Sequence, residues 1–167
     1  MPEIAAVVRE ALRADFIGTG QHRGRKKKRI ISAGALHPVK CAIIGASGNV
    51  VIYDDDLDIF SSAEPRDADR LKAFNKKCAD VLPFAQCHVL ALMADSGTLS
   101  TVYSNAQSLM WRDAGAVLQI LALVSEVFNL GFCPLGILGQ EVADALLPDG
   151  HRFIGVGVAA VGRHLCE

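Results

Sequence analysis

The sequence predicts an α+β fold in which a central mixed sheet is flanked by helices. Helical and extended patterns alternate along the chain, and a hairpin pattern lies among them. Residues 85–93 form an apolar stretch of strand length, which is typical of a central strand covered on both faces. Residues 113–130 form a helical pattern that is apolar nearly all round, so we expect this helix to be buried in a core or in a subunit interface.

The first half of the chain combines a helix, a basic run and a hairpin. Apolar residues at helical spacing predict an amphipathic helix over residues 3–14. Glycines then interrupt regular structure, and six of the seven residues from Arg23 to Arg29 are cationic. The Gly48–Asn49 pair marks a tight turn between two apolar runs. We therefore expect two hairpin strands and a short extended piece, at residues 39–45, 50–53 and 57–60.

The second half predicts helices before and after the central strand. A helical pattern over residues 66–82 stops at Pro83, because proline cannot continue a helix. Residues 96–107 are polar and weakly helical, and Gly131 is expected to cap the long apolar helix. The remaining expected elements are a loop, a short helix and a last strand, at residues 132–139, 140–147 and 152–161. With no repeat and no linker, residues 1–167 are interpreted as a single domain.

Composition limits the classes to which the protein can belong. With 51% hydrophobic and 21% charged residues among 167, the chain can bury a real core, and part of its apolar surface is expected to be covered by another subunit. A net charge of −1 gives no global field that would recruit nucleic acid or a membrane, and no stretch is long enough to span a bilayer. Five cysteines without a C-x-x-C pair indicate reduced thiols in a cytoplasmic protein.

Four segments resemble, in the same order, segments of the flavin-dependent nitroreductase-like family, and in particular of its SagB-type dehydrogenase branch. RIISAGALHPVKCAII is similar to the branch's Pro-Ser-Ala-Gly-Ala-Leu-Tyr-Pro segment with its following strand, and GNVVIYDDDLDIFSSAE is similar to the next hairpin. DAGAVLQILALVSEVFNLGFCPLGIL resembles the family's long helix and its Leu-Gly-x-x-Cys-x-x-Gly loop. FIGVGVAAVGR resembles the closing strand of the family.

This resemblance implies an FMN-dependent oxidoreductase with a nitroreductase-like fold. Members of the family bind FMN without a covalent bond at the interface of a homodimer, and NAD(P)H is often their electron donor. The SagB-type branch oxidises azoline rings in peptides instead. The implied activity is the transfer of a hydride between the flavin and a small-molecule or peptide substrate. Neither nucleic acid nor membrane is an expected partner.

Residues 32–38 (SAGALHP) are the first candidates for a flavin contact. Small residues at Ala33 and Gly34 let the backbone approach a flat ring, and the hydroxyl of Ser32 can donate a hydrogen bond. The alternative is an ordinary connection between a loop and a strand. His37 stands where the branch has tyrosine, and beside a flavin it could transfer a proton. The alternative for His37 is a loop-end histidine hydrogen-bonded to the backbone.

The FMN phosphate requires cationic residues, and three positions match. Lys28 and Arg29 end the basic run just before the SAGALHP segment, and Arg163 closes the last strand as an arginine does in the family. The basic run has two other interpretations. It could be a patch for nucleic acid or another anionic partner, or it could be a solvated mobile loop.

The segment after the long helix supplies further candidates. In the family this loop offers backbone N–H groups to the flavin, which implicates Pro134, Leu135 and Gly136, with the amide of Leu135 or Gly136 as the donor. Cys133 is expected to pack rather than to react. Asp113 matches the glutamate of the family's helix, or it serves as the N-cap of that helix.

The chain departs from the family at its N-terminus. It lacks the Arg-Arg-Ser-x-Arg segment that holds the FMN phosphate, and it begins about where the family's second helix should. A shortened flavoenzyme would therefore need Lys28, Arg29 and Arg163 as substitutes. The alternative is a non-catalytic scaffold or partner subunit that has lost flavin binding. The aspartates at 54–58 lack the glycine and glutamate of a calcium loop, so we expect a polar turn and no metal site.

Overall fold

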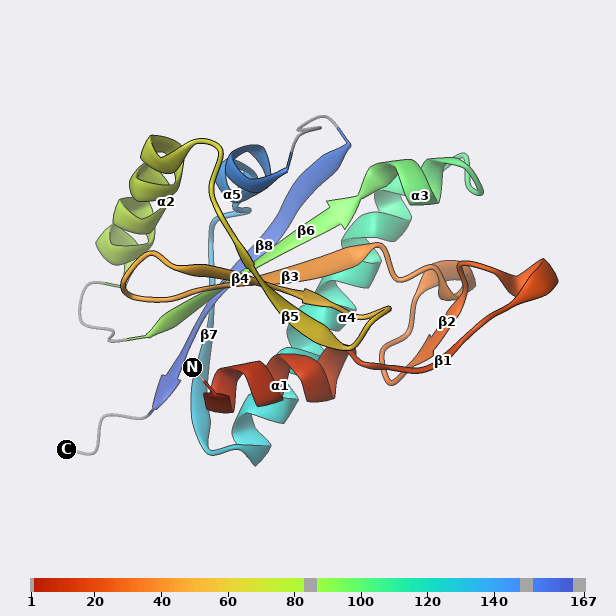
Figure 1. The fold of residues 1–167 in the computed structure, drawn as a ribbon, viewed down its shortest axis with the longest axis horizontal. Coiled ribbons are helices and arrows are strands. Elements are labelled where there is room, and N and C mark those ends of the chain that lie inside the picture. Colours follow the sequence, from red (N-terminus) through yellow and green to blue (C-terminus); the bar gives the residue numbers. More distant parts are fainter. Residues whose placement is uncertain (1, 83–86, 148–151, 164–167) are drawn as a thin grey trace.

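The computed structural model describes residues 2–82, 87–147 and 152–163. A six-stranded sheet with helices on both faces forms the body, and a two-stranded ribbon projects from one end (Figure 1). The sheet has the strand order β5-β4-β3-β6-β8-β7. Its strands are β3 (Val39–Ile44), β4 (Val50–Asp54), β5 (Ile59–Ala63), β6 (His88–Asp95), β7 (Leu130–Leu135) and β8 (Phe153–Arg163). The helices are α1 (Pro2–Leu12), α2 (Ala68–Val81), α3 (Ser96–Ser100), α4 (Ala106–Val127) and α5 (Gln140–Leu146).

The two faces of the sheet are covered by different helices. α1 and α4 pack on one face around Val7 and Leu121, and α2 and α5 pack on the other around Phe74 and Val142 (Figure 1). This arrangement confirms the expected α+β class, with a sheet flanked by helices. None of the described helices is long and apolar enough to cross a membrane.

β6 is the central strand that the apolar stretch predicted. It pairs with β3 on one side and β8 on the other, and its successive side chains alternate between the two cores, with Leu92 in one and Met93 in the other. We expected a sheet of mixed strand direction, but every strand pair among the described residues is antiparallel. Periodicity reveals which strands are buried, whereas strand direction depends on the route of the connections.

α4 starts earlier than its apolar pattern suggested, at Ala106 instead of residue 113. Met110 is buried while Gln107 and Ser108 are exposed, so the first two turns are amphipathic and lack the all-round apolar signal. Asp113 consequently lies within the helix, and its expected alternative role as an N-cap is wrong.

The segment after α4 is an edge strand instead of the expected loop. Residues 130–135 pair with β8 as β7, and the buried side chain of Leu130 anchors the start of that strand. We expected Gly131 to cap the helix, but the helix ends at Val127. Asn129 is the residue that takes the left-handed backbone conformation typical of a cap (φ 54°). Cys133 is exposed, so its expected role in packing is also wrong.

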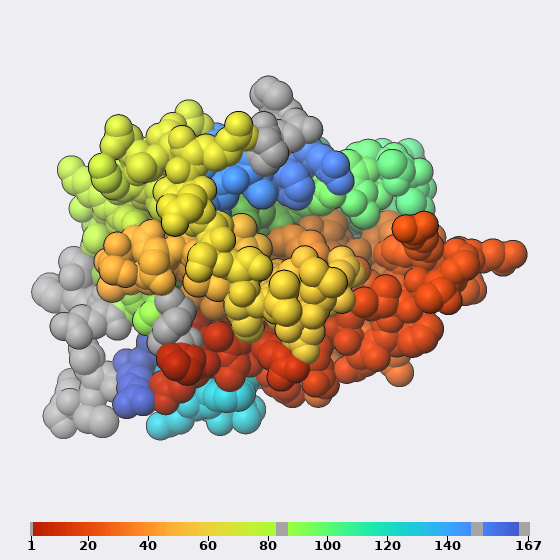
Figure 2. Space-filling view, in the orientation of Figure 1, coloured from red at the N-terminus to blue at the C-terminus, as the bar shows by residue number. Residues whose placement is uncertain are grey.

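The basic run is partly a strand. β2 (Lys26–Lys28) pairs with β1 (Ala14–Ile17) to form the ribbon that projects beyond the body of the molecule in Figure 2, in red and orange. Three consecutive lysines show no alternation of polar and apolar residues, so the period-2 signal of a strand is absent there. The interpretation as a mobile loop therefore does not hold for residues 26–28.

Candidate functional site

The segment Ser32–Pro38 joins the ribbon to β3 and has a strained backbone. Three of its residues have positive φ angles: Gly34 (60°), Ala35 (58°) and His37 (47°). Residues with a Cβ rarely adopt this conformation, which costs on the order of 1 kcal/mol or more for each of them. Contacts with surrounding elements must therefore hold the segment in place.

α4 holds the segment from one side through the buried carboxylate of Asp113. Ser32 Oγ donates a hydrogen bond to Asp113 Oδ2 at 2.5 Å, and the backbone N–H of Ala33 donates to Asp113 Oδ1 at 3.3 Å. Ser32 Oγ also accepts a hydrogen bond from the backbone N–H of His37 at 2.9 Å. A hydroxyl has one proton, so Ser32 cannot donate to a ligand while its bond to Asp113 is formed.

The ribbon holds the segment from the other side through His37. The ring Nε2 of His37 lies 3.0 Å from the carbonyl oxygen of Lys26, which can only accept, so Nε2 carries the proton. Burial, reinforced by the charge of Lys28, lowers the pKa of His37 to about 4. His37 is thus a loop-end histidine that is hydrogen-bonded to the backbone, which was the alternative to a role in proton transfer. Although Ser32, His37 and Asp113 are the residue types of a hydrolase triad, no hydrogen bond joins the ring of His37 to Ser32 Oγ among the described residues, so His37 does not activate Ser32.

Gly34 is required by its neighbours as well as by its backbone angle. The guanidinium of Arg25 donates to the carbonyl oxygen of Gly34, and a Cβ at this position would lie 2.4 Å from Arg25 Nη1 and 2.4 Å from Tyr103 Oη. Sequence reasoning missed both Arg25 and Tyr103. Arg25 was hidden among equivalent cations, and no signal marks Tyr103 because it comes from a distant loop.

An open groove of about 540 Å³ lies between this segment and the ribbon. Its lining is basic and apolar, with no aspartate or glutamate. The lining residues are Phe16, Gly18, His22, Arg25, Lys26, Lys27, Lys28, Ile30, Ile31, Ser32, Ala35 and His37. The groove therefore joins the SAGALHP segment and most of the basic run in one place.

Two of the lysines in the groove are committed to a buried ion cluster. The Nζ atoms of Lys26 and Lys28 both lie 2.7 Å from Asp55 Oδ2, and Lys40 also pairs with this carboxylate. Burial alone would raise the pKa of Asp55, but the ammonium groups of Lys28 and Lys40 hold it well below its usual range. The side chain of Lys28 is only 2% exposed, so this predicted phosphate ligand is directed at Asp55. The expected polar turn is present, since Asp54 accepts from two backbone N–H groups.

The other two predicted phosphate ligands form ion pairs at the surface. Arg163, 78% exposed, pairs with Glu3 at 2.7 Å, and Arg29 pairs with Glu10. Exposed pairs of this kind contribute little to stability, so a phosphate can compete with Glu3 or Glu10 for the arginine. Arg163 and Arg29 are thus more available to an anion than Lys28.

A single chain does not bring the predicted cofactor residues together. The carbonyl of Pro38 accepts a hydrogen bond from the backbone N–H of Asp95, and Asp95 pairs with Phe153 at the start of β8. Arg163 lies at the other end of this strand of 11 residues. At about 3.3 Å per residue, the two sites lie roughly 33 Å apart. Pro134 lies between them on the edge strand β7.

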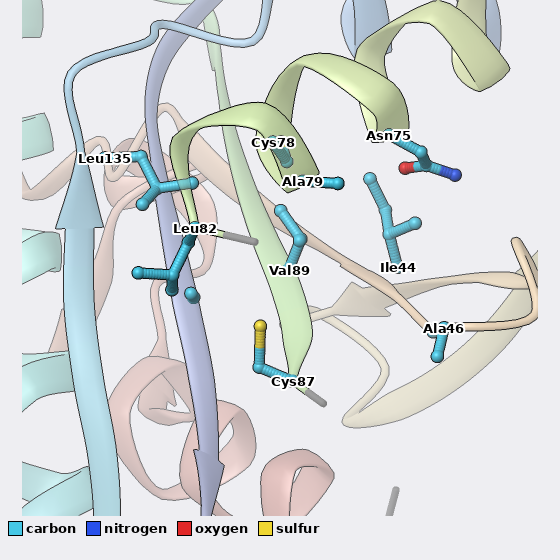
Figure 3. Close-up of a pocket in the computed structure, with 11 residues that line it drawn as sticks. Ile44, Ala46, Asn75, Cys78, Ala79, Leu82, Cys87, Val89 and Leu135 are labelled. Carbon is cyan, nitrogen blue, oxygen red and sulfur yellow. The ribbon is translucent and has the colours of Figure 1, made fainter. Parts of the chain in front are cut away.

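Leu135 faces a different cavity, which has a volume of about 220 Å³ and lies between α2 and the sheet (Figure 3). Cys78 and Cys87 also line this cavity. Burial raises the pKa of Cys78 to about 11 and also raises that of Cys87, so both thiols stay protonated near neutral pH. The cavity therefore has no reactive thiolate.

α4 and the residue that follows it carry large apolar side chains that the described part of the chain leaves exposed. Leu123 and Val127, one turn apart near the C-terminal end of the helix, are 56% and 83% exposed, and Trp111 and Phe128 are 38% and 39% exposed. Soluble monomers seldom expose several large apolar side chains on one helix. The helix was expected to be buried in a core or an interface, and the chain itself buries only one of its faces.

Comparison with solved structures identifies the fold as nitroreductase-like. A provisionally named nitroreductase from Anabaena variabilis matches 96% of the chain with a TM-score of 0.80 and 14% identity. The E. coli microcin synthetase McbBCD complex with truncated pro-MccB17 bound matches 99% with a TM-score of 0.71 and 15% identity. A provisionally named NAD(P)H:FMN oxidoreductase from Staphylococcus epidermidis matches 99% with a TM-score of 0.61 and 12% identity.

The chain spans 34% of the Anabaena protein, 64% of the E. coli chain and 77% of the Staphylococcus protein. No family profile and no curated protein matches the sequence. These neighbours, at 12–15% identity, show the fold of the chain, and the expected nitroreductase-like fold is confirmed.

Proposed function

We propose that the protein is an FMN-dependent oxidoreductase that works as a homodimer and transfers a hydride between the flavin and a small-molecule or peptide substrate. One observation carries the proposal. The predicted cofactor residues fall into two groups at opposite ends of the molecule, and the helix that connects these ends leaves the apolar side chains of Leu123 and Val127 exposed.

A two-fold dimer about α4 would combine the two groups. Asp113 fastens the SAGALHP segment near the N-terminal half of α4, and the C-terminal end of the helix leads into β7 beside Arg163. When the two-fold axis is perpendicular to α4, the helix faces its copy in the opposite direction, so each end of one helix meets the other end of its partner. The segment 32–38 of one subunit would then lie near Arg163 of the other.

The residues present fit FMN in part. Ala33 and Gly34 are partly exposed small residues that leave room for a flat ring, and the edge strand around Pro134 and Gly136 offers exposed backbone. Arg163 would hold the phosphate after exchange of Glu3, whereas Lys28 is bound to Asp55. Bound FMN would supply the hydride chemistry, with NAD(P)H as the proposed electron donor, and the chain would bind and orient the ring.

A second function is favoured by the ion pairs. All three predicted phosphate ligands are paired with carboxylates. These observations fit a non-catalytic nitroreductase-like scaffold or partner subunit that no longer binds flavin. The same dimer helix would then serve association alone.

The visible spectrum of protein purified without added cofactor tests the first function. We expect flavin absorption, and titration of the stripped protein with FMN should quench flavin fluorescence. Arg163→Ala should weaken binding by about 10- to 100-fold, because a charge-assisted hydrogen bond contributes about 1.5–3 kcal/mol. Arg66→Ala, at an exposed position before α2, is the control and should have no effect. A colourless protein that also fails to bind added FMN would exclude the flavoenzyme.

A further inference from the structure

The groove beside the ribbon has cationic side chains that the fold does not use. Lys26 pairs with Asp55 and Asp56, and Lys28 pairs with Asp55, but Lys27 is exposed and has no ion pair or hydrogen bond among the described residues. Arg25 also lines the groove and uses one nitrogen on the carbonyl of Gly34, which leaves further donors on its guanidinium. Because no carboxylate lines the groove, its field favours an anionic occupant.

The same groove exposes apolar side chains that a soluble surface usually hides. Phe16 is 61% exposed and Ile31 is 81% exposed, and both belong to its lining. Their position next to Lys27 makes the surface amphipathic. An occupant must therefore combine negative charge with apolar groups.

The ribbon also has unpaired backbone. Within the described residues, β1 and β2 pair only with each other, so each strand has an outer edge that no further strand covers, although the carbonyl of Lys26 in β2 is used by His37. An extended peptide can add to such an edge as a further strand, and alternate side chains then give specificity.

We propose that this groove is a docking surface for an extended acidic segment of a partner protein. The segment adds to the edge of the ribbon, its carboxylates face Lys27 and Arg25, and its aliphatic side chains cover Phe16 and Ile31. A nucleic acid is disfavoured because its affinity grows with the number of phosphates that are neutralised, and few cations of the groove are free. The docking surface needs no FMN, so it stands or falls separately from the flavin proposal.

Fluorescence anisotropy with a labelled synthetic peptide of about six residues, Val-Val-Glu-Glu-Val-Val, which presents both residue types on each face of a strand, tests this surface. We expect binding that weakens as salt is added, and Lys27→Glu should weaken it about tenfold because an attraction becomes a repulsion. Lys76→Glu is the matched control, since Lys76 is exposed on α2 and has no ion pair or hydrogen bond among the described residues. The measurement is made on protein free of flavin.

Three outcomes would overturn the proposal. One is no binding of the acidic peptide, another is equal binding of a peptide with lysine in place of glutamate, and the third is equal loss of affinity in Lys27→Glu and Lys76→Glu. A single-stranded oligonucleotide that binds while the acidic peptide does not would assign the surface to nucleic acid instead. Circular dichroism of each variant checks that it is folded. Ile31→Ser is a second, uncharged variant, and it should also lower the affinity for the acidic peptide.

Discussion

At the scale of single residues, the side chains that are best able to react with or bind a ligand are used to maintain the fold. Ser32 gives its proton to Asp113, and His37 gives the proton of its Nε2 to the carbonyl of Lys26. Lys28 is buried against Asp55. In each case a group that could act on a ligand is used to hold a strained segment or a buried charge. Free donors are found instead on Lys27, on Arg25 and on the backbone edges.

His37 should make stability depend on pH in a specific direction. Its pKa of about 4 in the folded protein is lower than the roughly 6.5 of an unfolded histidine, so the unfolded chain binds more protons between these values. The free energy of unfolding should therefore decrease as the pH falls from about 6.5 towards 4, by about 1–2 kcal/mol at pH 5.

Urea unfolding at neutral and mildly acidic pH measures this effect. His37→Gln retains an N–H donor but cannot titrate, so this variant should lose less stability on acidification than the wild type. His22→Gln, at an exposed position, should behave like the wild type. An identical pH dependence in His37→Gln and the wild type would contradict the prediction.

At the scale of elements, α4 connects the candidate loop to the proposed dimer interface. One face packs in the core, Asp113 fastens the Ser32–Pro38 segment, and the outer face remains uncovered. The loop conformation thus depends on a helix that is far from it in sequence. A change on α4 can therefore alter the loop without touching it directly.

Asp113→Ala should release the loop. It removes the acceptor for Ser32 and for the N–H of Ala33, and we expect a loss of about 2–3 kcal/mol in the free energy of unfolding. Hydrogen exchange at the amides of Ala33 and His37 should accelerate at the same time. Asp113→Asn keeps an acceptor oxygen and should lose less, while Glu126→Ala at an exposed position of α4 should change neither quantity. Unchanged exchange in Asp113→Ala would show that other contacts suffice.

At the scale of the whole molecule, two apolar cores are complete but one helix face is not. The sheet is covered by α1 and α4 on one side and by α2 and α5 on the other. The exposed side chains of Leu123 and Val127 lie outside both cores. A second copy that covers them in an antiparallel arrangement of α4 would also join the two groups of proposed cofactor residues.

Sedimentation at micromolar concentration should show a dimer for the wild type. Leu123→Glu should shift it to the monomer, because a charge in an apolar interface loses its hydration without compensation. The variant should stay folded, since Leu123 is exposed in the single chain. Leu57→Glu, on the exposed aspartate-rich turn, is the control and should remain dimeric. A monomeric wild type would refute the dimer.

Much of the fold could be predicted because it depends on local patterns. The hairpin around Gly48, the helix before Pro83 and the buried strand β6 follow from turn chemistry and periodicity. The start of α4 and the strands β1, β2 and β7 could not be predicted in this way. They depend on pairing and burial contributed by distant segments, such as β8 beside Leu130.

The sequence by itself determined the order and type of most elements, and it identified the SAGALHP segment and the basic run as the places to examine. The tertiary structure decided what those residues do. Asp113 and Asp55 come from elsewhere in the chain and bind Ser32 and Lys28, and the backbone of Lys26 in the folded ribbon binds His37. Periodicity records which face of an element is buried, whereas the partner of a buried polar group is set only when distant elements pack together.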